Sequence, residues 1–599
     1  MAAKRTIADQ MRGPGRFMTG PAPAVKNRRG ILRRLWTYLS TYRIGLLGTA
    51  LLVTVNTGLA LSGPYLIGRA IDKYITHGDL PGLARVALLM VAIYVAAAIG
   101  MWIQSISMIR IAQKTVRDIR RDLFNRLQSL SLRFFDRNPH GELMSRLTND
   151  TDTISATLGD SVTQLISSVL SVAGAGYIMF VLSWQLAAVT LITLPLILFV
   201  TRFIAERTRQ GFRDRQQALG KLNGMVEESI VGQRVIKACC REQEAIEKFT
   251  AANDELRRTA TKALFSVGLM GPAMNLFRNM GLAIVAGTGG WMVAKGLTTL
   301  GVVAAIINYA DYFNRPLNQL ANLYGTIQSA LAGAERVFAV IDEDPEVDDT
   351  PDTVSATDVR GEVEFDSVCF GYEKDTPVLK DVSFNVEAGQ TIALVGSTGA
   401  GKTTIINLLT RFYDIDSGSI RIDGQDIRNL HRNRLRRALG IVLQDTYLFS
   451  GTVYENIRYG RLDASDAEVE AAAGLANAEP FIRHLPHGFD TMLSEAGSNL
   501  SQGQRQLLAI ARTLLADPAI LILDEATSSV DTRTEIHIQQ ALHRLMQGRT
   551  SFIIAHRLNT IQRADCILVI ENGRIIERGN HDELLAQDGV YHHLYTSHN

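Results

Sequence analysis

The sequence predicts a helical membrane domain followed by a soluble α/β domain that contains a phosphate-binding loop. Uncharged apolar stretches long enough to cross a bilayer lie only before residue 341. Residues 361–599 instead alternate short apolar runs with turns and charged segments, as soluble α/β domains do. A glycine-rich loop, Gly396–Thr404, separates an apolar run from a helical pattern in this second part. The length of 599 residues also requires several domains.

Net charge and cysteine content exclude two classes of protein. A formal net charge of +2 argues against a generally basic nucleic-acid-binding protein. The cysteines form no disulfide framework. Two of them are adjacent in sequence, and such a pair rarely forms a disulfide, while the other two lie in a domain expected to face a reducing compartment. We interpret all four as packing residues: Cys239, Cys240, Cys369 and Cys566.

Six membrane crossings are expected, each needing about 20 apolar residues. Ser161–Thr201 is uncharged and long enough for two crossings, with a polar turn at Ser183–Gln185. Ionisable residues interrupt the last two candidates. The expected spans lie within Ile44–Gly68, Val86–Ile109, Ser161–Thr201, Ala263–Ala294 and Leu297–Leu320.

Lysine and arginine gather on one side of these spans, which sets the orientation. The first 43 residues, residues 110–146 and residues 202–262 are rich in both, unlike the turns near Ser183 and Lys295. Both termini are therefore expected in the cytoplasm of a multi-pass protein of the inner or plasma membrane. No cleaved secretory signal is recognisable. Residues 28–43 are typical of an amphipathic helix at the membrane surface, the alternative being a soluble cytoplasmic helix.

The two cytoplasmic connections, of about 50 and 60 residues, are too long for ordinary loops and are predicted to be helical. Helical hairpins of that size project about 35 to 45 Å from the membrane. Their tips are expected near Asp136–Leu147 and Ser229–Ala238.

The second domain contains the G-x-x-x-x-G-K-T pattern between an apolar run and a helix. Glycines let backbone N–H groups face phosphates, Lys402 can reach the β and γ phosphates, and the Thr403 hydroxyl can ligate Mg²⁺. A second apolar run ends in two carboxylates, of which Asp524 suits Mg²⁺ and Glu525 suits the attacking water. A third ends at His556, which could contact the γ phosphate or be structural.

These motifs, in this order, resemble those of ATP-binding cassette (ABC) transporters. They are FGY (Phe370–Tyr372), GSTGAGKTT (Gly396–Thr404), VLQD (Val442–Asp445), LSQGQ (Leu500–Gln504), ILILDEATSSVD (Ile520–Asp531) and IIAHR (Ile553–Arg557). With six spans ahead of the cassette, the chain resembles a half-transporter of the exporter fold. The expected domains are an N-terminal extension (1–28), a transmembrane domain with an elbow helix and two coupling hairpins (29–341), a linker (342–360) and a nucleotide-binding domain (361–599).

The resemblance implies roles for residues that the motifs contain. Tyr372 stacks on adenine, Gln444 joins the Mg²⁺ shell and couples to the membrane domain, and Asp531 communicates between two cassettes. Glu525 and His556 are the expected catalytic residues, and Thr403, Gln444 and Asp524 the expected Mg²⁺ ligands. ATP is expected to contact Tyr372, Gly396, Ser397, Thr398, Gly399, Ala400, Gly401, Lys402, Thr403, Thr404 and Gln444.

The LSQGQ turn implies a dimer, because in the family this turn covers the ATP held by the partner's phosphate loop. The residues expected to contact the partner's ATP are Ser501, Gln502, Gly503 and Gln504. Gln502 stands where the family usually has glycine, although LSQGQ also occurs in competent cassettes. The flanks resemble one subunit of heterodimeric bacterial multidrug exporters, in which the subunit with an intact glutamate lends its altered turn to a degenerate site. A heterodimer is therefore favoured over a homodimer.

Substrate contacts are sought among ionisable residues inside the membrane, where charge is costly. Arg278, Asp311 and Arg315 are the candidates. Arg278 and Asp311 lie at similar depth, about 20 Å from the external turn on a helical rise. They either pair two helices or contact the substrate.

The sequence thus predicts ATP-driven export of amphipathic or hydrophobic compounds, of the multidrug type, by alternating access. The alternatives are a homodimeric lipid flippase of the lipid A type, a peptide exporter, or an importer built on the exporter fold. The expected partners are a second half-transporter, the lipid bilayer and a small amphipathic substrate, with no nucleic acid. ATP and Mg²⁺ are the expected cofactors.

Overall fold

The computed structural model describes residues 27–346, 359–373, 376–443, 446–524, 532–554 and 561–597. The chain divides into two compact units. The first contains the residues up to Leu130 and Asn138–Asp344, and the second contains Ser131–Arg137 together with the residues from Pro345 onward. The short segment Ser131–Arg137 therefore belongs, by its contacts, with the C-terminal unit.

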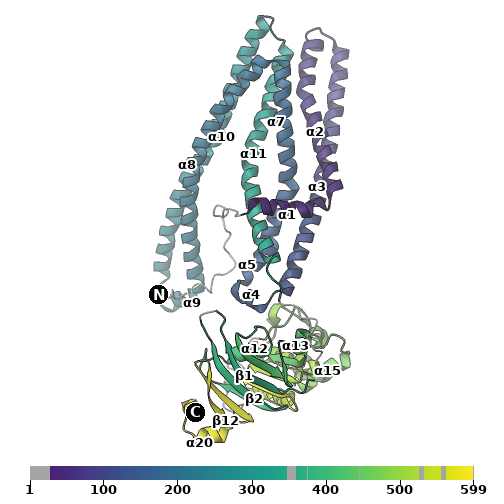
Figure 1. Cartoon of the computed structure of the whole chain (residues 1–599). Coiled ribbons are helices and arrows are strands. Elements are labelled where there is room, and N and C mark those ends of the chain that lie inside the picture. The colour runs from purple at the N-terminus through teal and green to yellow at the C-terminus, as the bar shows by residue number, and fades with distance from the viewer. Residues whose placement is uncertain are drawn as a thin grey trace. The chain divides into compact units, whose positions relative to one another are not determined.

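The first unit is built from long helices (Figure 1). They are α2 (Arg43–Ala70), α3 (Leu80–Ser129), α7 (Val162–Leu182), α8 (Trp184–Val231), α10 (Glu242–Ala294) and α11 (Leu300–Ile341). Helices α8 and α10 run side by side, while α2, α3, α7 and α11 pack together. Three of the expected ranges, Ile44–Gly68, Val86–Ile109 and Ala263–Ala294, fall within α2, α3 and α10. Ser161–Thr201 covers α7 and the start of α8, and Leu297–Leu320 begins three residues before α11. The chain turns at Ser183 as expected, where the Ser183 hydroxyl caps α8.

Shorter elements connect the long helices. At the first hairpin tip lie α4 (Leu132–Arg137) and α5 (His140–Ser145), and at the second lies α9 (Gln233–Ala238). The chain returns from the first tip through α6 (Thr151–Ala156) and two π-helical segments, η3 (Arg146–Asp150) and η4 (Thr157–Ser161); a third such segment, η2 (Ile71–Ile75), continues α2. Both predicted tips are thus breaks between long helices.

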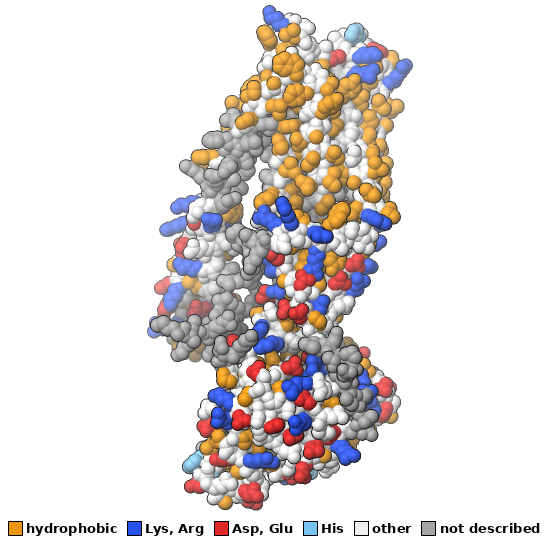
Figure 2. Space-filling model, viewed as in Figure 1, with side chains coloured by type: hydrophobic (Ala, Val, Ile, Leu, Met, Phe, Trp, Pro, Cys, Tyr) orange, Lys and Arg blue, Asp and Glu red, His pale blue; other side chains and the backbone are white. Residues whose placement is uncertain are grey.

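Hydropathy supports a membrane location for this unit. In the described part of the chain, three helical stretches are long and apolar enough to cross a membrane: Arg43–Ile75, Leu80–Ser129 and His140–Leu182. Figure 2 shows hydrophobic side chains covering the upper part of the helices on the face in view, bordered below by Lys and Arg side chains. This border is the distribution that a bilayer edge requires.

Helix α1 (Arg28–Ser40) is amphipathic, as expected. Ile31, Leu35 and Leu39 are buried on one face, while Trp36 on another face is 61% exposed. The hydroxyl of Tyr38 donates to the Asp122 carboxylate of α3 at 2.9 Å. Its ring stacks on Phe338 of α11, with centroids 6.0 Å apart. Helix α1 therefore ties α3 to α11.

Helix α11 is also tied to the return path of the first hairpin. The Arg336 guanidinium donates twice to the Asp150 carboxylate, over 2.8 and 2.5 Å. Asp150 is only 7% exposed, whereas the Arg336 side chain is half-buried, so the carboxylate is the buried partner of this pair. It raises the pKa of Arg336 through a direct hydrogen bond to Asp150.

The second unit is an α/β cassette with a four-stranded sheet (β2-β1-β4-β5), a six-stranded sheet (β12-β11-β3-β10-β9-β6) and the pair β7-β8. The strands are β1 (Val363–Phe370), β2 (Leu379–Val386), β3 (Thr391–Val395), β4 (Ser417–Ile422), β5 (Gln425–Asp426), β6 (Leu439–Val442), β7 (Gly451–Thr452), β8 (Met492–Leu493), β9 (Ile520–Asp524), β10 (Thr550–Ile554), β11 (Cys566–Glu571) and β12 (Arg574–Gly579). Strands β11, β3, β10, β9 and β6 are parallel, and β12 is antiparallel to β11.

The cassette helices are α12 (Lys402–Leu409), α13 (Arg432–Ala438), α14 (Val453–Arg458), α15 (Asp466–Leu475), α16 (Glu479–Ile482), α17 (Gln502–Ala516), α18 (Thr532–Met546), α20 (His581–Ala586) and α21 (Val590–Ser597). Two 3₁₀ turns, η5 (Gly488–Asp490) and η6 (Glu495–Gly497), precede α17.

Two hydrophobic cores lie on opposite faces of the six-stranded sheet. Alternate residues of a strand point to opposite faces. Accordingly, Ile392 and Leu394 of β3 pack in the core that contains α12. Ala393 and Val395 pack in the core that contains α17. Helices α12 and α17 therefore cover opposite faces of the sheet.

The cysteines follow the packing interpretation only in part. Cys566 is buried and Cys369 half-buried, and all four are free thiols. Cys239 and Cys240 are exposed at the end of α9, so the packing interpretation is wrong for this pair. The reason is their place at a hairpin tip, where few neighbours exist to bury them.

Candidate functional site

The phosphate loop joins β3 to α12 and depends on glycine at two positions. Gly396 has φ 154° and Gly401 has φ 113°, values that side-chain-bearing residues rarely adopt. A Cβ on Gly396 would lie 2.2 Å from the Ile570 carbonyl oxygen, and one on Gly401 would lie 2.7 Å from Leu379 Cδ2. Residues 397–399 are exposed at the end of the loop, just ahead of the α12 N-terminus. In this arrangement, backbone N–H groups of the loop can face a bound anion such as phosphate.

Lys402, the first residue of α12, is 7% exposed. Its ammonium donates to the carbonyl oxygens of Gly396 at 2.7 Å and Ser397 at 2.9 Å. Burial lowers its pKa, and the nearby Asp524 carboxylate acts in the opposite direction. The lysine is thus held across the loop, with its charge where phosphate oxygens are expected.

Thr403 and Asp524 supply oxygens at the same edge of the sheet. Thr403 is exposed in the first turn of α12, whereas Asp524 is the last residue of β9. Strand β10 lies between β3 and β9 and pairs Ile554 with both Leu394 and Asp524, so the three strands end level with one another. A hydroxyl and a carboxylate are ligands that Mg²⁺ accepts, with phosphate oxygens and water completing its shell. The residues therefore fit Mg²⁺.

Tyr372 is anchored beside the phosphate-loop helix. Its hydroxyl lies 3.2 Å from Thr404 Oγ1 and accepts a hydrogen bond from Asn407 Nδ2 at 3.2 Å. Its ring meets those of Phe370 and Tyr413 edge-on, at centroid distances of 5.0 and 5.1 Å. The half-buried aromatic ring is thereby fixed close to the phosphate loop.

The LSQGQ turn begins α17 through a capping box. Ser501 Oγ accepts a hydrogen bond from the Gln504 N–H at 3.3 Å, and the Gln504 side chain accepts from the Ser501 N–H at 2.9 Å. Gln502 is half-buried at the first helical position, and Gly503 is buried behind it. The turn thus exposes Ser501 and a helix N-terminus, a combination suited to an anion.

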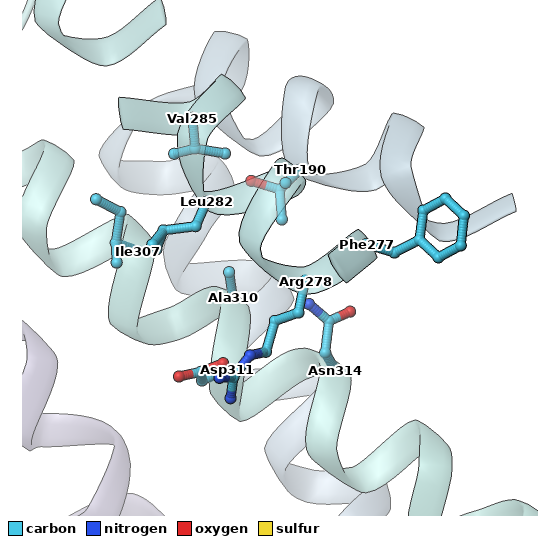
Figure 3. Close-up of a pocket in the computed structure, with 10 residues that line it drawn as sticks. Thr190, Phe277, Arg278, Leu282, Val285, Ile307, Ala310, Asp311 and Asn314 are labelled. Atoms are coloured by element: carbon cyan, nitrogen blue, oxygen red, sulfur yellow. The ribbon is translucent and has the colours of Figure 1, made fainter. Parts of the chain in front are cut away.

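The membrane unit contains a small pocket between α8, α10 and α11 (Figure 3). Arg278 and Asp311 line it and point toward one another, from α10 and α11 respectively. The full lining comprises Thr190, Phe277, Arg278, Gly281, Leu282, Val285, Ile307, Ala310, Asp311 and Asn314. The two charges predicted to lie at one depth are therefore brought to one pocket, whereas Arg315 is exposed outside it.

Comparison with known proteins decides the family. Residues 46–317 match the ABC transporter transmembrane region, and residues 379–528 match the ABC transporter cassette. The "Uncharacterized ABC transporter ATP-binding protein YfiC" of Bacillus subtilis is 49% identical over 96% of this chain and 95% of its own length. The chain belongs to the ABC transporter family.

Other relatives of this ABC transporter carry more specific names. A "Fatty acid ABC transporter ATP-binding/permease protein" of Mycobacterium bovis is 46% identical over 86% of this chain and 82% of its own. An "ATP-dependent lipid A-core flippase" of Syntrophus aciditrophicus is 39% identical over 90% and 89%. A solved bacterial Atm1-family ABC exporter with ATP bound superposes with a TM-score of 0.73 and 34% identity, covering 93% of this chain and 99% of that one.

These findings confirm the predicted class of protein. The chain is an integral membrane half-transporter of the exporter fold, and its cassette is an ATPase coupled to transport. ABC exporters of this type work as dimers of half-transporters in a membrane, bind ATP and drive export with it.

Some predicted site residues lie outside the described ranges. They are Gln444, Glu525, Asp531 and His556. Asp524, at the end of β9, precedes Glu525 in the chain, and Ile554, at the end of β10, lies two residues before His556. Their roles remain predictions.

Sequence reasoning missed Arg512 of the ABC cassette. It donates to the backbone oxygens of Asn456 at 2.9 Å and Tyr447 at 3.2 Å. Burial lowers the pKa of its guanidinium. Arg512 thus connects α17 to α14 and to the segment that follows Gln444. The available signal was an arginine within the largely apolar stretch Leu507–Ala516.

Proposed function

We propose that this half-transporter exports amphipathic compounds and that their polar group contacts Arg278 and Asp311. The observation that carries the proposal is the membrane pocket of Figure 3. Its lining joins apolar side chains, among them Phe277 and Leu282, to a positive and a negative charge. Such a mixed lining suits a molecule with an apolar body and a polar head.

The cost of charge in a membrane supports a functional role. Ionisable residues within spans are retained where they pair with one another or contact what passes. Arg278 and Asp311 line one pocket together with apolar side chains, so both charges lie beside a space that a molecule could enter. We therefore favour a substrate contact.

Neutralising each residue singly and together separates the two roles. We expect Arg278→Gln and Asp311→Asn each to raise the KM for substrate, and the double variant to be no better than either single one. Arg315→Gln is the matched control: Arg315 lies in α11, as Asp311 does, but outside the pocket, so its neutralisation should leave KM unchanged. Recovery of ATPase and transport in the double variant would instead make the pair structural.

At the nucleotide, we propose that Lys402 binds the β and γ phosphates and that Thr403 and Asp524, with Gln444, would hold Mg²⁺. A bound Mg²⁺ would supply positive charge that offsets the charge developing on the phosphates in the transition state. Glu525 polarises the attacking water and His556 contacts the γ phosphate; both follow strands that end at the phosphate-loop edge. Glu525→Gln should therefore lower ATP hydrolysis at least about a hundredfold while ATP still binds.

We further propose that this chain's turn at Ser501 serves ATP held by a partner cassette, with Asp531 communicating between the two. Helices α12 and α17 cover opposite faces of one sheet, which supports use of the turn in trans. Gln502 favours a different chain as that partner. Co-purification with a second half-transporter should raise ATPase activity well above that of the chain alone, and full activity of the chain alone would favour a homodimer.

A lipid substrate is the second candidate, because relatives are named for fatty acids and for lipid A-core. Proteoliposome assays with a fatty acid, a labelled lipid and an amphipathic cationic dye distinguish the candidates. We expect transport of the dye; transport of the fatty acid or lipid alone would favour the second candidate. We also propose that transport is outward, and that the protein lies in the inner or plasma membrane with both termini in the cytoplasm.

A further inference from the structure

We propose that Tyr413 is a positioning residue for Tyr372, and that Asp136 and Arg133 of α4 help to hold these two tyrosines in place. The inference rests on the proposed role of Tyr372 as the adenine platform. Tyr413 belongs to none of the nucleotide motifs: it lies four residues after the end of α12.

Helix α4 contacts the cassette at the residues around this platform. It belongs, by its contacts, to the compact unit of the cassette. The Arg133 guanidinium donates to the backbone oxygen of Tyr372 itself, at 2.9 Å. The Tyr413 hydroxyl donates to the Asp136 carboxylate. Arg133 and Asp136 are three positions apart, so one face of α4 makes both contacts.

Tyr413 transmits the contact to the ring of Tyr372. Tyr413 is 7% exposed, and its ring is nearly perpendicular to that of Tyr372, at 89° and 5.1 Å between centroids. It also packs against Phe370 at 5.7 Å. A ring enclosed in this way cannot give way when its neighbour moves, because packed cores resist continuous deformation. A shift of Tyr372 therefore moves Tyr413.

Tyr372 is consequently held at three points. Its backbone is held by Arg133, its ring edge by Tyr413, and its hydroxyl by Thr404 and Asn407 of the phosphate-loop helix. Burial and the hydrogen bond to Asp136 both raise the pKa of Tyr413, so its phenol stays a donor at physiological pH. These contacts fix the plane and position of the ring on which adenine is proposed to stack.

The test compares Tyr413→Phe with a matched tyrosine. Tyr454 also donates its hydroxyl to a carboxylate, that of Glu470, and stacks on a phenylalanine, but it lies elsewhere in the cassette. We expect Tyr413→Phe to raise the KM for ATP about three- to tenfold, the effect of one lost hydrogen bond, with kcat within about twofold. Tyr454→Phe should change neither of these quantities.

Tripolyphosphate separates the base from the phosphates, because it occupies the phosphate loop without an adenine. Its inhibition constant should be the same in Tyr413→Phe and the wild type, within about twofold. A change equal to that in the KM for ATP would show general damage to the site and would overturn the inference.

Asp136→Asn and the double variant with Tyr413→Phe guard against misfolding as an explanation. Asp136 is exposed, so its neutralisation leaves no buried charge. The two changes should be non-additive, with the double variant resembling either single one. Additive effects would contradict a shared role. Tyr372→Ala distinguishes the underlying proposal: if it raises the KM and Tyr413→Phe does not, the inference fails while the adenine platform stands, and if neither does, the platform itself is wrong.

Discussion

Replacing Ser501 with alanine tests which composite site the LSQGQ turn serves. Ser501 caps α17, and Ser465 caps α15 with the same geometry. Ser465 Oγ accepts the Glu468 N–H at 3.4 Å, and the Glu468 side chain accepts the Ser465 N–H at 2.8 Å. The corresponding distances at Ser501 are 3.3 and 2.9 Å. Each alanine variant should therefore lose about 1 kcal/mol of stability.

That loss is small for a cassette of this size and should lower the melting temperature by about 2 to 4 °C in both variants. Because the two variants lose similar stability, any difference in ATPase activity between them shows a contact between Ser501 and the nucleotide. In the proposed heterodimer the altered turn serves a degenerate site. The ATPase activity of Ser501→Ala should accordingly stay within about twofold of that of Ser465→Ala. This difference is far smaller than the one expected from losing a hydrogen bond to a reacting phosphate.

The assay is steady-state ATPase of the purified transporter with its partner, alongside thermal unfolding. A hydrogen bond to a charged group contributes about 1.5 to 3 kcal/mol, which corresponds to about a ten- to hundredfold rate change. A loss of that size in Ser501→Ala, with Ser465→Ala unaffected, would show that the turn does not serve a degenerate site. The turn would then cover a hydrolysing site, as it must in a homodimer.

Two further predictions concern backbone and charge. Gly401→Ala should weaken ATP binding at least about tenfold, because φ 113° and a 2.7 Å clash distort the phosphate loop; Gly424→Ala, at φ 77° with open space around it, shares only the strain and should bind ATP normally. Arg336→Ala should lower the free energy of unfolding by about 3 kcal/mol, because it leaves the buried Asp150 carboxylate without its arginine. Arg120→Ala, which breaks an exposed pair, should cost no more than about 1 kcal/mol.

The sequence predicted features that a short stretch of residues determines by itself. Apolar length and absent charge located the helices, and the single polar interruption located the turn at Ser183. The phosphate loop was predictable because Gly396 and Gly401 are required by backbone geometry and by close neighbours, whatever the rest of the fold. The amphipathic α1 followed from side-chain periodicity alone.

Contacts between distant residues were not predictable. Asp136 and Tyr413 are 277 positions apart; Asp136 lies in the predicted first hairpin tip, but nothing in the sequence pairs it with Tyr413. Asp150 and Arg336, 186 positions apart, are likewise brought together only by the packing of helices. The effect of Gln502 depends on a partner chain, so no single sequence determines it.

ATP-dependent transport into inside-out proteoliposomes that contain the transporter and its partner half tests the proposed export directly. We expect accumulation of an amphipathic dye that requires hydrolysable ATP, stops in Glu525→Gln, and shows a raised KM for the dye in Arg278→Gln but not in Arg315→Gln. Accumulation that continues in Glu525→Gln, or that Arg278→Gln leaves unchanged, would contradict it.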